Sequence, residues 1–111
     1  MTNMVNRGEV WWVNFSQSIG GEIQKTRPAV IVSNDYSNRS LNRVQVVPIT
    51  SNVSKCYPCE AYVTIDNNRA KAMADQLTTI SKERLSKKLT SLSNDEILKI
   101  GQAIKLQLNL E

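Results

Sequence analysis

Residues 28–33, Pro28-Ala29-Val30-Ile31-Val32-Ser33, form a short apolar run rich in β-branched side chains. A run of this length without polar alternation is typical of a strand buried on both faces. The proline stands at the first position, where a strand tolerates a residue that lacks an N–H group. We therefore expect a buried strand here, entered from a long polar loop over residues 16–27.

Four other segments have the composition of strands. They combine β-branched and aromatic residues between turn-forming stretches, and they span residues 8–15, 43–50, 60–65 and 74–80. Pro48 indicates that the strand over 43–50 lies at an edge, carries a bulge or ends there. Residues 34–42 and 51–58 are predicted to be connections, with room for a helical turn at 69–72.

The C-terminal segment has helical periodicity. Ser93 and Glu96 have the spacing of a capping box, in which each side chain satisfies a free backbone N–H group. The apolar residues that share one helical face are Ile97, Ile100, Ile104 and Leu108. Gly101 interrupts this helix and predicts close packing against another backbone. Short strands followed by one helix predict a mainly β fold, a small antiparallel β barrel with a packed C-terminal helix.

Length and composition narrow the classes of protein. A chain of 111 residues fits one domain over residues 1–111, and pairing with a second copy would help to complete so small a core. No apolar run approaches the roughly 20 residues that cross a bilayer, and the first residues do not resemble a signal peptide. We therefore expect a cytoplasmic protein without membrane contact. The net charge of +4 suits a polyanionic partner without proving one.

The absence of histidine removes the usual acid–base residue near neutral pH, and with it most zinc sites. Cys56 and Cys59 form a C-x-x-C pattern, but the chain holds no further Cys or His to complete a zinc site. The strand-like segment that follows does not fit a thioredoxin-type motif, so we interpret them as ordinary reduced cysteines. Asp35, Glu60 and Asp75 would form a two-metal site only if clustered, and their spacing gives no support for that.

Two strand ends carry residues suited to phosphate chemistry. RNA can be cleaved by its own 2′-hydroxyl, and the catalyst must move protons and stabilise charge on the phosphoryl oxygens. Arg27 stands where the polar loop enters the buried strand, and Thr50 and Ser51 stand where another strand ends. A guanidinium binds phosphate through two parallel hydrogen bonds. The alternatives are a surface ion pair for Arg27 and a hydroxyl that caps its own backbone for Thr50.

Several segments within residues 7–85 form an ordered pattern. They are Arg7-Gly8-Glu9-Val10-Trp11-Trp12-Val13, residues 20–35, Val46-Val47-Pro48-Ile49-Thr50-Ser51, Tyr57-Pro58-x-Glu60 and Ala74-Asp75-Gln76-Leu77. Together they resemble the MazF/PemK-type toxins, the ribonuclease component of bacterial toxin–antitoxin pairs. The Gly-x-Glu…Arg-Pro pattern within residues 20–35 is the specific part of this resemblance. Here Ile23 follows the loop glutamate, where the family often has glutamine.

The resemblance implies a homodimer of SH3-like antiparallel β barrels of the PemK/CcdB-like kind. It also implies sequence-specific, metal-independent cleavage of single-stranded RNA, including mRNA, to a 2′,3′-cyclic phosphate and a 5′-hydroxyl, with inhibition of translation and growth. No cofactor is implied. The family's arginine and threonine carry over onto Arg27 and Thr50, and its loop glutamate onto Glu22.

We assign the expected roles as follows. Arg27 would stabilise the phosphorane charge, Thr50 with Ser51 would hydrogen-bond a phosphoryl oxygen, and Glu22 is a candidate to accept the 2′-hydroxyl proton. Residues in or beside loops could contact the RNA, with solvated surface as the alternative reading; they are Gly21, Gln24, Lys25, Thr26, Asn52, Lys55, Tyr57 and Gln76. We expect base choice to depend on the loops over 16–26 and 51–58. Trp11 and Trp12 could stack on bases, but one of two adjacent strand residues must point inward.

The resemblance also implies partners. They are single-stranded RNA, a second copy of the chain, and an acidic, partly disordered antitoxin, through which alone operator DNA would be contacted. One alternative is a non-enzymatic gyrase poison of the CcdB type, which acts through a C-terminal Trp-Gly-Ile sequence. This chain ends Leu108-Asn109-Leu110-Glu111 and has no tryptophan after Trp12. A further alternative is a nucleic-acid-binding barrel without catalysis.

Overall fold

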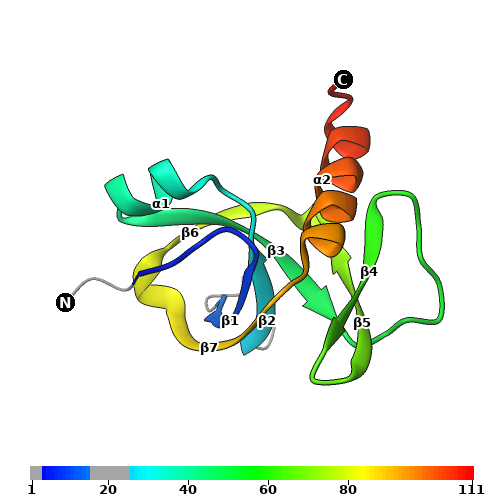
Figure 1. Cartoon of the computed structure of the whole chain (residues 1–111), viewed down its shortest axis with the longest axis horizontal. Helices are drawn as coiled ribbons and strands as arrows, with labels where there is room; N and C mark the ends of the chain where they lie inside the picture. Colours follow the sequence, from blue (N-terminus) through cyan, green and yellow to red (C-terminus); the bar gives the residue numbers. More distant parts are fainter. Residues whose placement is uncertain (1–3, 16–25) are drawn as a thin grey trace, which may run out of the picture.

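The computed structural model describes residues 4–15 and 26–111, which form a curled antiparallel sheet with a C-terminal helix (Figure 1). The elements in chain order are β1 (Glu9–Asn14), β2 (Thr26–Ile31), α1 (Asp35–Ser40), β3 (Arg43–Thr50), β4 (Glu60–Ile65), β5 (Asn68–Met73), η1 (Ala74–Gln76), β6 (Thr78–Ser81), η2 (Lys82–Arg84), β7 (Leu85–Ser91) and α2 (Asn94–Leu108). The strand order is β4-β5-β3-β2-β1-β7, and β6 pairs with β3 beside this path. The predicted fold class, mainly β with a C-terminal helix, is confirmed.

The inner strands are buried on both faces, as residues 28–33 predict. In β2, Ala29 and Ile31 belong to one hydrophobic cluster and Val30 belongs to the other. In β3, residues 44 and 46 face the second cluster, while residues 47 and 49 face the first. The first cluster packs against α2, whereas the second lies with β6 and β7 on the opposite face. The sheet therefore separates two small cores.

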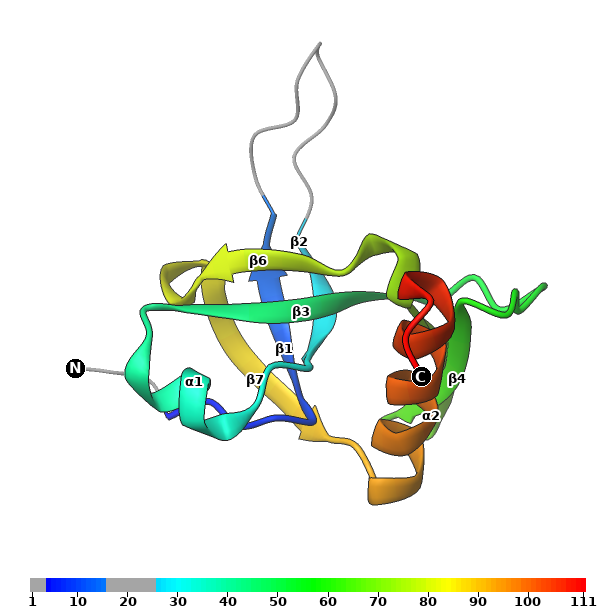
Figure 2. The same ribbon diagram turned by 90° about the horizontal axis from the view of Figure 1, so that it is seen from above.

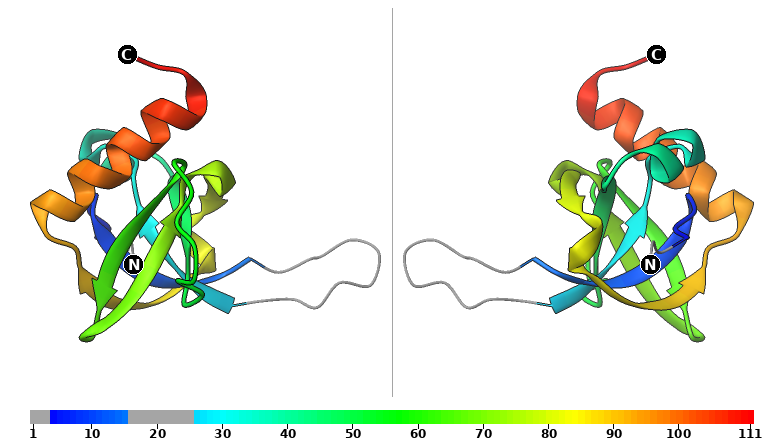
Figure 3. Two further views of the ribbon diagram at one scale, coloured as in Figure 1. Left: turned by 90° about the vertical axis from the view of Figure 1, so that its right-hand side faces the viewer. Right: turned by 90° about the vertical axis from the view of Figure 1, so that its left-hand side faces the viewer.

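Pro48 lies within β3 and interrupts no ladder. Residues 43–46 of β3 pair with β6, and residues 49–50 pair with β5. Pro48 stands between these two partners, so its missing N–H costs no ladder hydrogen bond on that side. Figure 2 shows β3 running beside β6, and Figure 3 shows the β4–β5 hairpin crossing the direction of β1 and β2. Pro48 thus lies inside a central strand, and the prediction that it marks an edge, a bulge or the end of the strand is wrong.

The helix α2 begins with the predicted capping box, and its carboxylate also reaches the sheet. The Ser93 hydroxyl accepts a hydrogen bond from the Glu96 N–H at 3.2 Å, and a Glu96 carboxylate oxygen accepts one from the Ser93 N–H at 3.0 Å. The other Glu96 oxygen accepts a hydrogen bond from the N–H of Thr64 at 2.7 Å. Because β4 is an edge strand, this bond satisfies a backbone group that has no strand partner. Glu96 thus joins the helix start to the sheet edge.

Several predicted elements are wrong in detail. Residues 35–40 form the helix α1 within a predicted connection, and residues 69–72 belong to β5 rather than to a helical turn. The strand predicted over 74–80 is divided into η1 and β6, and β7 was not predicted because its Lys87 and Lys88 mask the strand pattern. Residues 26 and 27 lie in β2 rather than in the preceding loop.

The apolar face of α2 is shorter than predicted. Ile100 is buried and Ile97 and Ile104 pack on the first cluster, but Leu108 is 51% exposed. A side chain at Gly101 would find Arg7 Nη2 at 3.9 Å as its nearest described neighbour, so the expected close backbone contact is absent from the described residues. No helix in the described part of the chain is long and apolar enough to cross a membrane.

We predict that Glu96→Gln lowers the free energy of unfolding at pH 7 by about 1 kcal/mol. Burial raises the pKa of Glu96, but hydrogen bonds from Ser93 and Thr64 outweigh it and hold this pKa below its ordinary value of 4.5. A lowered native pKa stabilises the fold above the unfolded value and loses this effect as the pH falls through the native value. Urea titrations should therefore show the difference from wild type shrinking below about pH 4.5.

The matched control is Asp95→Asn, because the Asp95 carboxylate is exposed and lies 3.7 Å from Lys99 in an exposed ion pair. Asp95→Asn should lower the free energy of unfolding by less than about 0.5 kcal/mol. If Asp95→Asn and Glu96→Gln lower it equally, the role of Glu96 at the sheet edge is contradicted.

We predict that Gly8→Ala and Gly101→Ala change stability in opposite directions. Gly8 has φ +91°, and an added Cβ would overlap Ile97 Cδ1 and lie 3.2 Å from Ile97 Cγ1. The cost should be about 2–4 kcal/mol. At Gly101 in α2, an added Cβ would lie 3.9 Å from Arg7 Nη2, which is an ordinary van der Waals distance. Alanine there should therefore raise the free energy of unfolding by about 0.5–1 kcal/mol. The measurement is urea unfolding of both variants. Destabilisation by Gly101→Ala would contradict the inference that an alanine side chain fits at this position.

Candidate active site

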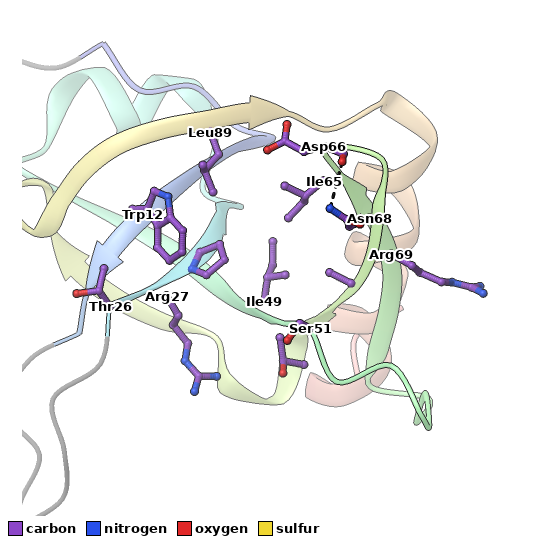
Figure 4. A pocket seen from close by; sticks show the side chains of 13 residues that line it. Trp12, Thr26, Arg27, Ile49, Ser51, Ile65, Asp66, Asn68, Arg69 and Leu89 are labelled. Atoms are coloured by element: carbon purple, nitrogen blue, oxygen red, sulfur yellow. Dashed lines mark hydrogen bonds between the residues drawn. The ribbon is translucent and has the colours of Figure 1, made fainter.

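A pocket of about 650 Å³ opens where the first hydrophobic cluster reaches the surface between β1, β3 and the β4–β5 turn (Figure 4). Its inner wall is apolar, and its rim is polar or charged. The wall residues are Trp12, Pro28, Ile49, Ile65, Ala70 and Leu89, and the rim residues are Thr26, Arg27, Thr50, Ser51, Asp66, Asn68 and Arg69. The pocket is thus an uncovered end of the core with hydrogen-bonding groups around it.

The pairing of β2 with β3 brings the two predicted strand ends together. The ladder aligns Ala29 with Pro48 and Ile31 with Val46. Continued by two residues, this antiparallel register places Arg27 opposite Thr50. Both residues line the pocket, as do Thr26 and Ser51. Figure 4 shows Arg27 and Ser51 at one edge of the pocket, with Asp66 and Asn68 at the opposite edge.

The polar groups at this edge have unused hydrogen-bonding capacity. The Arg27 side chain is half-buried, and its guanidinium forms no hydrogen bond or ion pair with another residue of the described ranges. The Thr50 hydroxyl accepts a hydrogen bond from the N–H of Asn52 at 3.2 Å. A hydroxyl that accepts one bond still carries a hydrogen to donate. The backbone-capping reading of Thr50 is therefore correct, and it is compatible with donation to a ligand.

A buried ion pair holds the loop that follows Thr50. The Lys71 ammonium on β5 donates to Glu60 Oε1 at 2.9 Å and to the carbonyl of Lys55 at 2.6 Å. Glu60 Oε1 also accepts from the Tyr57 N–H at 2.9 Å. The hydrogen bond to Glu60 raises the pKa of Lys71. Burial raises the pKa of Glu60, but the bonds from Tyr57 and Lys71 bring it below its ordinary value. The pair fixes residues 55–57 to the sheet.

The structure gathers some of the predicted RNA-binding residues and not others. Asn52, Lys55 and Tyr57 lie in the loop after Thr50 but do not line the pocket. Within this loop Asn52 accepts hydrogen bonds from the N–H and the hydroxyl of Ser54. Gln76 lies on η1, away from the pocket, and its amide contacts Met73 Sδ at 3.5 Å. Glu22, Gly21, Gln24 and Lys25 lie outside the described residues.

The pocket also contains Trp12, one of the two tryptophans proposed to stack on bases, and Asp66 and Asn68, which the sequence analysis did not assign to a site. Trp12 pairs with Pro28 across β1 and β2, on the face of the first cluster, whereas Trp11 packs against the second cluster. Asp66 and Asn68 belong to the turn between β4 and β5, where Asp66 and Asn67 have positive φ. The alternation of side chains along β1 could have separated the two tryptophans. Nothing in the Asp-Asn-Asn turn pattern distinguishes a functional turn from an ordinary one.

The two cysteines do not line this pocket, and neither do Asp35, Glu60 and Asp75, the acidic residues considered as metal ligands. Cys56 and Cys59 are free thiols, and burial with the nearby Asp75 and Glu60 carboxylates raises the pKa of Cys59. A raised pKa is the opposite of what a reactive thiol needs. Within residues 4–15 and 26–111, no three Cys, Asp or Glu side chains cluster as metal ligands. The Asp35 carboxylate instead accepts from the Arg7 N–H at 2.6 Å.

Comparisons with known proteins show the family of this chain. Residues 6–108 match the family described as PemK-like, MazF-like toxin of type II toxin–antitoxin system. The chain is 36% identical to endoribonuclease MazF9 of Mycobacterium tuberculosis, covering 96% of this chain and 98% of that relative. It is 30% identical to endoribonuclease EndoA of Bacillus subtilis, covering 96% and 97%.

Solved structures share the fold at lower identity. The chain matches MazF from Deinococcus radiodurans with a TM-score of 0.82 and 22% identity, over 98% of this chain and all of the other. It matches a mycobacterial endoribonuclease in complex with its cognate antitoxin with a TM-score of 0.79 and 24% identity, over 96% and 97%. The chain belongs to the PemK-like, MazF-like toxin family of type II toxin–antitoxin systems.

Proposed function

We propose that this protein is an endoribonuclease toxin that cleaves single-stranded RNA at the pocket edge formed by Arg27 and Thr50. One observation carries the proposal: the ends of β2 and β3 bring to one pocket a donor hydroxyl and a guanidinium that has no partner among residues 4–15 and 26–111. The two curated relatives are named endoribonucleases, and each aligns with 96% of this chain. The pocket opens to the surface beside strand ends, where an extended nucleic acid strand can reach it.

The reaction is transfer of the phosphoryl group to the neighbouring 2′-oxygen. The 2′-oxygen forms a bond to phosphorus, the bond from phosphorus to the 5′-oxygen breaks, and the products are a 2′,3′-cyclic phosphate and a 5′-hydroxyl. Arg27 stabilises the charge that develops on the phosphoryl oxygens through its fork of N–H donors. The hydroxyls of Thr50 and Ser51 donate to the same oxygens. These groups act without a metal ion or cofactor.

Two protons move during this reaction. One leaves the 2′-hydroxyl and one reaches the departing 5′-oxygen. The side chains at the Arg27 edge of the described pocket donate hydrogen bonds, and none is a carboxylate. Glu22 is our candidate for the proton acceptor. Its carboxylate would come from the segment between β1 and β2, whose ends flank Arg27.

We further propose the biological setting that the family implies. The protein acts in the cytoplasm as a homodimer, cuts mRNA at short sequences, and thereby stops translation and growth. An acidic, partly disordered antitoxin inhibits it, and contacts with operator DNA run through that antitoxin. Structural neighbours include a mycobacterial endoribonuclease in complex with its cognate antitoxin and MazE-MazF of Deinococcus radiodurans. The net charge of +4 suits both the acidic partner and RNA.

We predict that Arg27→Ala and Thr50→Ala each lower kcat for RNA cleavage by about 10²–10³-fold, because each removes a donor to the developing charge. Both variants should stay folded, since these side chains lie at the rim rather than in a cluster. The measurement is cleavage of a labelled single-stranded RNA in excess EDTA. Arg43→Ala is the control, because Arg43 is exposed at the other end of β3.

Three results would contradict this mechanism. They are loss of wild-type activity in EDTA with rescue by added metal, full activity of Arg27→Ala, and RNA binding without cleavage by the wild type. Mapping the cut ends across total RNA would identify the cleavage sequence and the cyclic phosphate in one experiment.

We predict that Lys71→Met raises KM for RNA several-fold with a smaller effect on kcat, because the loop over 51–58 loses its attachment to β5. Lys88→Met is the control: it also removes one positive charge and one ion pair to a glutamate, Glu9, at 3.2 Å, but it lies on β7 away from that loop. Lys71→Arg should retain most of the affinity. An equal rise of KM in both methionine variants would show a general charge effect instead.

A further inference from the structure

The wall of the pocket is an exposed part of the first hydrophobic cluster. Ile49 and Ala70 belong to the buried members of that cluster, and Ile65 and Leu89 pack against it. The helix α2 covers another part of the cluster through Ile97, Ile100 and Ile104 and does not line this pocket. An open apolar wall beside donor groups is typical of a site that binds a flat, partly polar ligand.

Trp12 gives this wall an aromatic face. Successive residues of a strand point to opposite sides, and here Trp11 packs on the second cluster while Trp12 lines the pocket. The Trp11 indole is also held by a hydrogen bond from Nε1 to Glu9 Oε1 at 3.0 Å. Trp12 has no such bond within the described residues and is half-buried. Its ring is therefore the one available to stack on a ligand.

The turn between β4 and β5 supplies polar groups at the far edge. Asp66 and Asn68 are exposed there, opposite Arg27 and Ser51 (Figure 4). The Asn68 side chain donates to the backbone carbonyl of Asp66 at 3.2 Å, which orders the turn. The Asp66 carboxylate has no described partner. Arg69 is not available to the pocket, because its guanidinium stacks 3.7 Å from the centre of the Tyr62 ring.

We propose that this pocket is a nucleobase subsite, in which the base next to the scissile phosphate stacks on Trp12 and its edge is read by Asp66. The inference rests on the proposed function, because the phosphate bound at Arg27 and Thr50 determines which nucleotide reaches the pocket. A volume of about 650 Å³ accommodates a base with its ribose. Stacking on an aromatic ring is available to every base, so Trp12 contributes affinity and not choice.

Selectivity comes from the turn. A carboxylate only accepts hydrogen bonds. The exocyclic amino group of adenine, cytosine or guanine can donate to Asp66, whereas the N3–H of uracil lies between two carbonyl oxygens that repel a carboxylate. Asp66 therefore favours a base that carries an exocyclic amino group over uracil. Base choice next to the cut thus depends on the β4–β5 turn, in addition to the loops over 16–26 and 51–58.

The first experiment uses the two tryptophans as reporters. In Trp11→Phe the only indole left is Trp12, and in Trp12→Phe the only one left is Trp11. Each variant is titrated with random-sequence 2′-O-methyl RNA hexamers, which cannot be cleaved because the attacking hydroxyl is blocked. We expect saturable quenching of Trp12 and an unchanged signal from Trp11. If RNA does not quench Trp12, the subsite is overturned. If Trp12 fluorescence falls as the protein concentration rises in the absence of RNA, the subsite is also overturned, and the apolar wall is instead a contact with another copy of the chain.

The second experiment tests the reading of the base. Asp66→Asn is compatible with the turn, because asparagine also adopts the positive φ of 51° found there. It converts an acceptor into a group that also donates. Competing RNAs that differ only in the base beside the cut should then lose at least about fivefold of their discrimination. Asp95→Asn, an exposed change of the same charge on α2, should leave the discrimination unchanged.

The outcomes separate this inference from the proposed function. Cleavage by the wild type with unchanged base choice in Asp66→Asn overturns the subsite and leaves the endoribonuclease intact. Quenching of Trp12 by RNA without cleavage by the wild type overturns the endoribonuclease, and with it the assignment of the base beside a cut. Quenching together with relaxed choice supports both.

Discussion

The antiparallel pairing of β2 with β3 is the constraint on which the rest of the structure depends. It aligns Ala29 with Pro48, and the same register carried to the strand ends sets Arg27 opposite Thr50. A shift by one residue would turn every side chain of β2 to the other face and exchange the members of the two clusters. Because both faces of these strands are buried, such a shift would put Ala29 and Ile31 where Val30 packs and the reverse, and the changed volumes would leave gaps or overlaps in both clusters. Core packing thus fixes the site geometry.

The same pairing explains why a polar site lies beside an open apolar wall. Pro48 marks the point where β3 exchanges β6 for β5, and the sheet bends away there. The β4–β5 hairpin then stands apart from β1 and β7, and the first cluster is left uncovered between them. Two glutamates stabilise the flanks of this opening. Glu96, at the start of α2, accepts a hydrogen bond from the N–H of Thr64, and Glu60 accepts one from the N–H of Tyr57 in the loop after Thr50. The opening is therefore a consequence of the sheet topology rather than a packing fault.

Much of this fold is predictable from the sequence, and the failures have physical causes. The strands over 43–50 and 60–65 and the capping box at Ser93 were predicted because their patterns are local. The strand β7 was not predicted, because its outward lysines break the apolar alternation. The strand β5 was missed because a lysine does not indicate a buried position, whereas Lys71 is buried through its bonds to Glu60 and to the Lys55 carbonyl. The pair Arg27 and Thr50 could be nominated from the sequence, but their common pocket requires the register. Asp66 carries no signal in the sequence, because only the β4–β5 hairpin brings it to the pocket.

The composition of the pocket constrains how catalysis can be divided among its residues. Without histidine, no side chain of the chain changes charge near neutral pH at its ordinary pKa. The described groups at the Arg27 edge are a guanidinium and hydroxyls, which donate hydrogen bonds and stabilise negative charge. Asp66, the one carboxylate of the described lining, lies at the opposite edge (Figure 4). In the proposed mechanism, charge stabilisation at the Arg27 edge is therefore separate from proton transfer, for which Glu22 in the segment between β1 and β2 is the candidate acceptor.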